Sequence, residues 1–198
     1  MALNGSDLIN RIKVLEEELE KEFSKRREEF HFIIENKRIR FAEEMIAAHK
    51  RVKMGVIRYL LDAHPLNVIT APVIYAGFVP FLLLDLFLTI YQTICFPSYG
   101  IPKVKRADYL VFDREELPYL NVIEKFNCFY CSYANGLASY AREIGARTEQ
   151  YWCPIKHSRR IRDAHKHYHK FFEFGDAESF AKGLERLRKE MEKIDKNE

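Results

Sequence analysis

The sequence predicts a mostly α-helical protein built around a membrane-embedded segment. The first observation is an apolar block, Val68–Phe96, whose 29 residues include one charged side chain, Asp85. About 20 mostly apolar residues are enough for a helix to cross the hydrocarbon core of a bilayer. The second observation is that the first 64 residues lack proline and place apolar residues at helical spacing. The third is a group of cysteine and histidine residues in 127–157.

The composition sets limits on the class of protein. The 198 residues include 32 Lys and Arg against 29 Asp and Glu, and this net charge of +3 does not by itself imply nucleic-acid binding. No nucleic-acid-binding module accompanies the clustered basic residues, so a nucleic-acid partner is not expected. The start of the chain lacks the basic and apolar regions of a cleaved signal, so we expect the apolar block to be a permanent anchor. We predict four segments: an amphipathic helical arm (1–62), a membrane-embedded segment (63–102), a Cys/His-rich metal-binding domain with a basic segment (103–175) and a C-terminal amphipathic helix (176–198).

The N-terminal arm is predicted to be one long helix over residues 6–60. Apolar residues recur every 11 positions, a repeat of 3.67 residues per turn that keeps them on one face of a nearly straight helix. The first series is Leu8, Leu19, Phe30, Phe41 and Val52. Such a helix would be about 80 Å long at 1.5 Å per residue, and the rest of the chain is too small to cover its apolar stripe. We therefore expect the arm to self-associate, as a homo-oligomer or within a larger membrane complex.

The apolar block follows the arm directly. His64 precedes Pro65, which disfavours helical backbone angles and ends the first helix. Within the block, Gly77 and Pro80 allow two geometries. One is a single membrane span, roughly Val73–Phe96, kinked at Pro80, and the other is a re-entrant hairpin bent near Gly77–Pro80. Because a charged group is costly in lipid, we expect Asp85 to face a partner side chain.

Flanking charge does not set the orientation of this block, since four basic residues lie on each side of it. The thiols of the following segment favour a reducing compartment. We therefore expect a membrane location with the Cys/His domain on the cytoplasmic side.

The Cys/His segment has the spacing Cys-x2-Cys-x21-Cys-x3-His. These ligand types and pair spacings are typical of a tetrahedral zinc site. A helix over Ser132–Ile144, ended by Gly145, would hold the first pair at its N-terminus, where partial positive charge favours thiolate. The metal ligands we predict are Cys128, Cys131, Cys153 and His157.

Other uses of these cysteines stay open. Iron or an iron–sulfur cluster is the alternative cofactor to zinc. A redox dithiol at Cys128 and Cys131, or simply buried cysteines, are the remaining interpretations.

Two carboxylates in the same segment are candidates for acid–base chemistry. Glu143 and Glu149 would each serve as the general base if the metal site were catalytic. The alternative is that these acids, with the neighbouring arginines, form ion pairs that hold a helix to a loop.

A basic segment and a final helix close the chain. The stretch 156–170 carries six Lys and Arg beside one Asp, which favours binding to anionic lipid headgroups. The residues we expect to contact headgroups are Lys156, Arg159, Arg160 and Arg162. Asp176 begins the final amphipathic helix, whose stripe is Phe180, Leu184, Leu187, Met191 and Ile194.

These patterns together favour a non-catalytic role. The protein is expected to be a membrane-anchored accessory or scaffold subunit, with a structural Cys/His metal site and self-association through its N-terminal helix. The alternative is a membrane-bound metalloenzyme, or a redox- or metal-responsive regulator, that uses the same Cys/His cluster. The sequence leaves open whether any reaction is catalysed.

Overall fold

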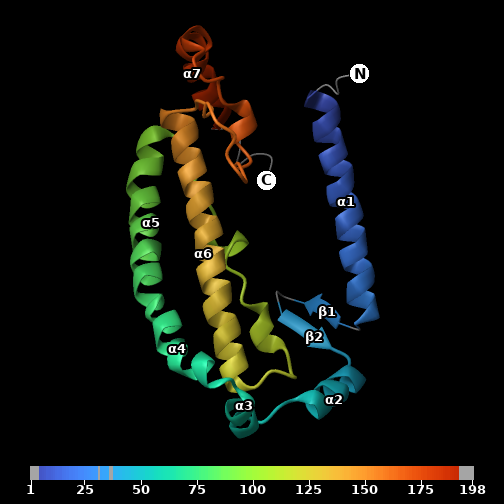
Figure 1. Cartoon of the computed structure of the whole chain (residues 1–198). Coiled ribbons are helices and arrows are strands. Elements are labelled where there is room, and N and C mark those ends of the chain that lie inside the picture. The colour runs from blue at the N-terminus through green and yellow to red at the C-terminus, as the bar shows by residue number, and fades with distance from the viewer. Residues whose placement is uncertain (1–4, 31, 36–37, 192–198) are drawn as a thin grey trace. The chain divides into compact units, whose positions relative to one another are not determined.

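The computed structural model describes residues 5–30, 32–35 and 38–191, and it is mostly helical (Figure 1). The chain divides into two compact units, residues 1–62 with 113–126, and residues 63–112 with 127–198. In the described residues the elements are α1 (Gly5–Glu29), β1 (Phe32–Glu35), β2 (Arg38–Phe41), α2 (Glu43–Val52), α3 (Val56–Asp62), α4 (Pro65–Ala76), α5 (Phe78–Tyr99), η1 (Arg106–Asp108), η2 (Asp113–Glu116), α6 (Val122–Trp152), η3 (Tyr168–Lys170) and α7 (Ala177–Met191).

The first unit corrects the prediction of one helix over residues 6–60. The helix α1 ends at Glu29, and an antiparallel pair follows in which Phe32 lies opposite Phe41. Aromatic and β-branched residues in 32–34 suit a strand better than a helix interior, and this local preference interrupts the apolar repeat. Phe41 contacts His49 of α2, and His49 contacts Tyr119, each with ring centroids 5.1 Å apart.

The apolar block forms one helical path of 35 residues, Pro65–Tyr99, long and apolar enough to cross a membrane. His64 caps α4, since its Nδ1 accepts a hydrogen bond from the amide of Leu66 at 3.3 Å. A bend at Gly77 separates α4 from α5, but Gly77 has right-handed helical backbone angles. The described chain therefore continues through this point, and the re-entrant hairpin is not formed.

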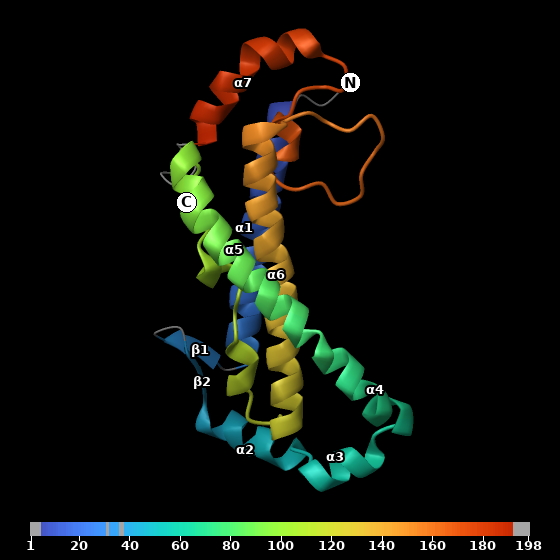
Figure 2. The ribbon, with the colours of Figure 1, turned by 90° about the vertical axis from the view of Figure 1, so that its left-hand side faces the viewer.

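The second unit is organised by α5 and α6, which lie beside each other and cross at an angle (Figures 1 and 2). They run in the same direction, because Asp85 contacts Tyr133 near the start of the pair and Tyr91 contacts Thr148 further along. The segment 101–112, which we call the return segment, leads the chain back along them. Its buried residues Ile101, Val104 and Leu110 join the core that Leu88, Phe96, Leu137, Tyr140 and Ile144 form.

The helix α6 extends past the predicted stop. Gly145 lies within it, and the helix ends at Trp152. Gly136, one of the buried positions of this helix, allows close backbone packing, since a Cβ atom there would lie 2.6 Å from the carbonyl oxygen of Tyr109. The return segment can therefore approach α6 more closely than a side chain would permit.

The last part of the chain folds back onto α6. A short parallel bridge joins Ile155 to Phe172, and α7 starts after Asp176, whose carboxylate accepts a hydrogen bond from the amide of Ser179 at 3.0 Å. The predicted start of this helix is thus confirmed. Arg188 of α7 lies over the ring of Tyr151, 4.5 Å from its centroid, while Ile194 is outside the described residues.

Candidate functional site

A polar cluster lies at the middle of the inner face of α5, the face that packs against α6 and the return segment. Asp85 accepts hydrogen bonds from Arg106 Nη2 at 2.8 Å and from the hydroxyl of Tyr133 at 3.0 Å. About two helical turns further along α5, the buried side-chain amide of Gln92 donates a hydrogen bond to the hydroxyl of Tyr140 and accepts one from the backbone amide of Val104. As expected for a charged group in an apolar helix, Asp85 faces partner side chains.

These contacts change the properties of the tyrosine. Burial and the hydrogen bond to the Asp85 carboxylate raise the pKa of Tyr133 to about 12. Tyr133 therefore stays a neutral hydrogen-bond donor at physiological pH. The cluster consists of an ion pair and hydrogen bonds that connect α5 to α6 and to the return segment.

A second polar cluster, which we call the Glu143 cluster, connects α6 to the segment that follows it. The carboxylate of Glu143 accepts from Arg147 Nε at 2.9 Å, one turn along the same helix. It also lies 3.1 Å from Nε2 of His167 and 3.4 Å from Nζ of Lys166. Arg147 in turn donates to the carbonyl oxygen of Pro102 at 2.8 Å. The cluster thus ties three segments of the second unit together.

The charge of Glu143 is stabilised by these neighbours. Burial alone would raise the pKa of this carboxyl group, but the hydrogen bonds from His167 and Arg147 outweigh it and lower the pKa to about 2. A carboxylate with such a low pKa is a weak proton acceptor at neutral pH. Glu143 is therefore suited to holding an ion pair, the alternative that the sequence analysis left open.

Glu149, further along α6, also contacts a histidine of the segment that follows this helix. Its Oε2 lies 3.1 Å from Nε2 of His165. Burial lowers the pKa of His165, although the hydrogen bond and charge of Glu149 act in the opposite direction. Nearby, Arg142 forms an ion pair with Asp163 at 3.0 Å. A small hollow of about 230 Å³ opens here, lined by Tyr109, Ser139, Arg142, Glu143, Ala164, His165 and Lys166.

The histidine partners in both pairs are not indicated by any pattern in the sequence. His165 and His167 lie in a loop segment 16 and 24 residues away from their partners, and no local pattern announces such a contact. The only signal available was the spacing of four residues between Glu143 and Arg147, which is typical of an ion pair on one helix.

The four predicted metal ligands are not brought together by the structure. Cys128 and Cys131 lie on neighbouring turns of α6, whereas Cys153 follows the end of the same helix. At 1.5 Å per residue, Cys128 and Cys153 are about 37 Å apart along the helix axis. The backbone amide of His157 contacts the hydroxyl of Tyr168 at 2.7 Å. Throughout 5–30, 32–35 and 38–191, no three His, Cys, Asp or Glu side chains lie close enough to share a metal ion.

The reason for this separation is the continuity of α6. The prediction required a loop between the two ligand pairs, so that the second pair could fold back onto the first. The helix instead continues through Gly145, and it holds the pairs at opposite ends. A zinc site shared by all four residues would require α6 to break.

The outer face of α5, opposite the inner face, is apolar and exposed. Its side chains are each roughly half exposed or more, and they are Leu82, Leu83, Leu86, Phe87, Ile90 and Ile94. The exposed face continues onto α4 with Ile69 and Val73. Only 6% of the most apolar stretch of this helix is buried. An exposed apolar surface of this kind marks a place where lipid or protein is bound.

The basic segment is exposed as well. Arg159, Arg160 and Arg162 are exposed, and no ion pair to any of them is found within the described part of the chain. Lys156 instead pairs with Glu173. Three of the four residues expected to contact headgroups are therefore available to an anionic surface.

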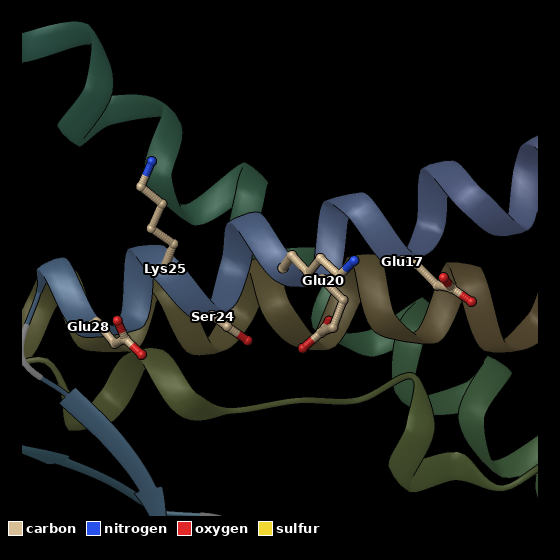
Figure 3. Close-up of a pocket in the computed structure, with 6 residues that line it drawn as sticks. Glu17, Glu20, Ser24, Lys25 and Glu28 are labelled. Carbon is tan, nitrogen blue, oxygen red and sulfur yellow. The ribbon is translucent and has the colours of Figure 1, made fainter.

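A further hollow, on α1, is lined by Glu17, Glu20, Lys21, Ser24, Lys25 and Glu28 (Figure 3). All of its lining residues belong to a single helix, and the labelled side chains point outward from that helix. It is a shallow space between surface side chains, without the converging groups that a binding site needs.

Comparison with known proteins gives no closer identification. No family model, curated protein or solved structure matches this chain.

Proposed function

We propose that this protein is a membrane-associated accessory or scaffold protein whose outer face on α4 and α5 is buried in lipid. The observation that supports this proposal most strongly is the combination of two faces on one apolar helix. The inner face packs against α6 and the return segment, while the outer face carries exposed leucine, isoleucine and phenylalanine side chains. A water-soluble protein would rarely leave so large an apolar surface uncovered.

The polar clusters support a scaffold role for the second unit. Asp85 with Arg106, and Glu143 with Arg147 and His167, join segments that are distant in sequence. Their charged groups are paired, and the Glu143 carboxylate is a poor base. These features favour a rigid support over a catalytic centre.

The basic segment supplies a second contact with the membrane in this proposal. Each Lys or Arg near an anionic surface contributes about 1 kcal/mol of binding free energy. Arg159, Arg160 and Arg162 are exposed, so we expect binding to strengthen with the anionic lipid content and to weaken with salt.

Vesicle sedimentation of the purified full-length protein tests this proposal. We expect binding to vesicles of zwitterionic and anionic lipid after removal of detergent. The double substitution Leu83→Lys with Phe87→Lys on the outer face should weaken partitioning at least tenfold, because two large apolar side chains are lost from lipid. Asn135→Lys, at an exposed position of α6, is the matched control. A protein that stays fully in the supernatant without lipid or detergent would reject the proposal.

Self-association through α1 remains a prediction of the sequence, now confined to a shorter helix. Ile12, Leu15, Leu19 and Phe23 are spaced along one face of α1, and each is about half exposed. At 1.5 Å per residue, the 25 residues of α1 give an arm of about 37 Å. Chemical cross-linking in detergent tests this interface, with Leu19→Glu expected to reduce the dimer and Lys21→Glu as the control. A monomer at all concentrations would contradict it.

A further inference from the structure

The course of the return segment beside α5 bears on how this helix meets the membrane. The backbone amide of Val104 donates a hydrogen bond to Oε1 of Gln92 at 3.1 Å, and Nη2 of Arg106 donates one to Oδ2 of Asp85 at 2.8 Å. Further on, the rings of Phe112 and Phe129 have centroids 5.1 Å apart, and Phe129 in turn stacks near Phe78. The return segment therefore lies level with α5 from Gln92 back to Phe78.

This segment is unsuited to the hydrocarbon core of a bilayer. Within 101–112, all of which the structure describes, the only regular element is the short 3₁₀ turn η1. Four charged residues are exposed there, namely Lys103, Lys105, Arg106 and Asp108. Irregular backbone facing lipid leaves peptide groups without hydrogen-bond partners, and charged side chains add a further cost.

No position of the helix across a bilayer avoids this conflict. A span needs about 20 residues, and the apolar helix has 35. Every window of 20 residues between Pro65 and Tyr99 includes residues 80–84, which are level with the return segment. A crossing helix would therefore carry part of the return segment into the hydrocarbon core with it.

The two faces of α5 suggest a different geometry. Asp85, Leu88 and Gln92 lie on the inner face, and Leu83, Phe87 and Ile90 lie on the outer face. At 100° per residue these two sets point in opposite directions around the helix. A helix with protein on one side and exposed apolar side chains on the other can enter one leaflet sideways, to a depth of about 5–10 Å.

We infer that α4 and α5 do not cross the membrane but lie in the plane of one leaflet, with the outer face in the acyl chains. The inner face, the return segment and α6 then stay on the aqueous side of that leaflet. This inference rests on the proposed function and specifies its geometry. The occupant of the outer face is lipid, because the charged return segment opposite to it marks the side that must remain in water.

Depth-dependent fluorescence quenching tests the inference on the full chain bound to vesicles of phosphatidylcholine and phosphatidylglycerol. In a background with all four cysteines replaced by serine, a fluorophore is placed singly at Ile69, Val73, Leu83, Leu86, Ile90 and Ile94. Lipids with a quencher near the headgroup or deep in the acyl chain then report its depth. We expect a shallow and uniform depth, with the ratio of the two quenching signals equal within about twofold at all six positions.

A helix that crosses the bilayer gives a different profile. Its central positions would be quenched mainly by the deep quencher, and its two ends mainly by the shallow one. That profile, in protein that sediments with vesicles, would overturn the in-plane geometry and leave membrane association intact. A fluorophore at Asp108 is the matched control, and it should be quenched by aqueous iodide and by neither lipid quencher.

The remaining outcomes concern the proposed function itself. Protein that does not sediment with vesicles overturns both the membrane association and the inference. A soluble oligomer whose outer-face fluorophores are shielded from both lipid quenchers and iodide would show that a second copy of the chain covers this face, and it would also overturn both.

Discussion

Arg106 holds Asp85 through two of its nitrogen atoms, with Nη2 2.8 Å from Oδ2 and Nε 3.3 Å from Oδ1. The pair joins η1 to the middle of α5, and the side chain of Asp85 is 15% exposed. We expect Asp85→Ala to lower the free energy of unfolding by about 1–3 kcal/mol, the range for hydrogen bonds to charged groups. Thermal or denaturant unfolding in detergent measures this loss.

A double-mutant cycle separates this pair from its surroundings. If Asp85→Ala and Arg106→Ala act through the same contact, their combined effect is smaller than the sum of the two. Asp62→Ala is the control, because Asp62 pairs with Arg58 at 3.5 Å with both side chains more than half exposed. Strict additivity would show that the bidentate pair contributes nothing.

Glu143→Ala should be among the most destabilising single substitutions in the second unit. It removes the carboxylate that pairs at 2.9 Å with Arg147, whose side chain is 3% exposed. Removing one member of a buried ion pair costs about 3–5 kcal/mol. Unfolding measured at neutral pH tests this, with Glu178→Ala as the control, since its pair with Lys182 is exposed. A loss below about 1 kcal/mol would contradict the structural role of the cluster.

The pH dependence gives a separate test of Glu143. Its pKa is about 2 in the folded protein and about 4.5 when unperturbed, so the folded carboxylate holds a proton less readily. The stabilisation is complete above about pH 4.5 and is lost as pH falls toward 2. The stability difference between the wild type and Glu143→Gln should shrink over this window. A difference that is constant from pH 6 to pH 3 would contradict the ion pair.

Two glycines of α6 should respond in opposite ways to alanine. A Cβ atom at Gly136 would lie 2.6 Å from the carbonyl oxygen of Tyr109, so Gly136→Ala should cost about 1–3 kcal/mol through overpacking. No atom lies within 4 Å of a Cβ at Gly145, so Gly145→Ala should stabilise the helix by up to about 1 kcal/mol. Melting temperatures of the two variants measure both effects. Equal shifts would mean that the return segment does not pack on α6.

The cysteines provide a test of the zinc prediction. Cys131 lies in α6 and Cys153 follows the end of that helix, and both are exposed, so Cys131→Ser and Cys153→Ser should each change the free energy of unfolding by less than about 0.5 kcal/mol. Metal analysis of the purified protein accompanies the unfolding measurement. Stoichiometric zinc that is lost from both variants would restore the four-ligand site and require a break in α6.

The sequence predicts well where a strong local signal exists. The apolar helix is predicted by composition alone, and the end of the helix before it is predicted by the His64–Pro65 pair. The start of α7 is announced by Asp176, whose carboxylate caps the helix. In each case the deciding interaction joins residues only a few positions apart, so a pattern in the sequence is sufficient.

The predictions fail where distant contacts decide. The apolar repeat across residues 6–60 is compatible with a helix, but pairing of Phe32 opposite Phe41 favours strands there. At Gly145, the cost of one glycine, up to about 1 kcal/mol, is small beside the packing of buried Ile144 and Arg147. The histidine partners of Glu143 and Glu149 come from a separate segment, and no short-range sequence pattern predicts these contacts.

The parallel arrangement of α5 and α6 also has a consequence for biosynthesis. The ribosome completes α5 at Tyr99, but α6 ends at Trp152, 53 residues later. At about 5–20 residues per second, the inner face of α5 stays without α6, its protein partner, for roughly 3–10 s. During that interval the nascent chain needs a chaperone or a nearby bilayer, and translation next to a membrane would supply the latter.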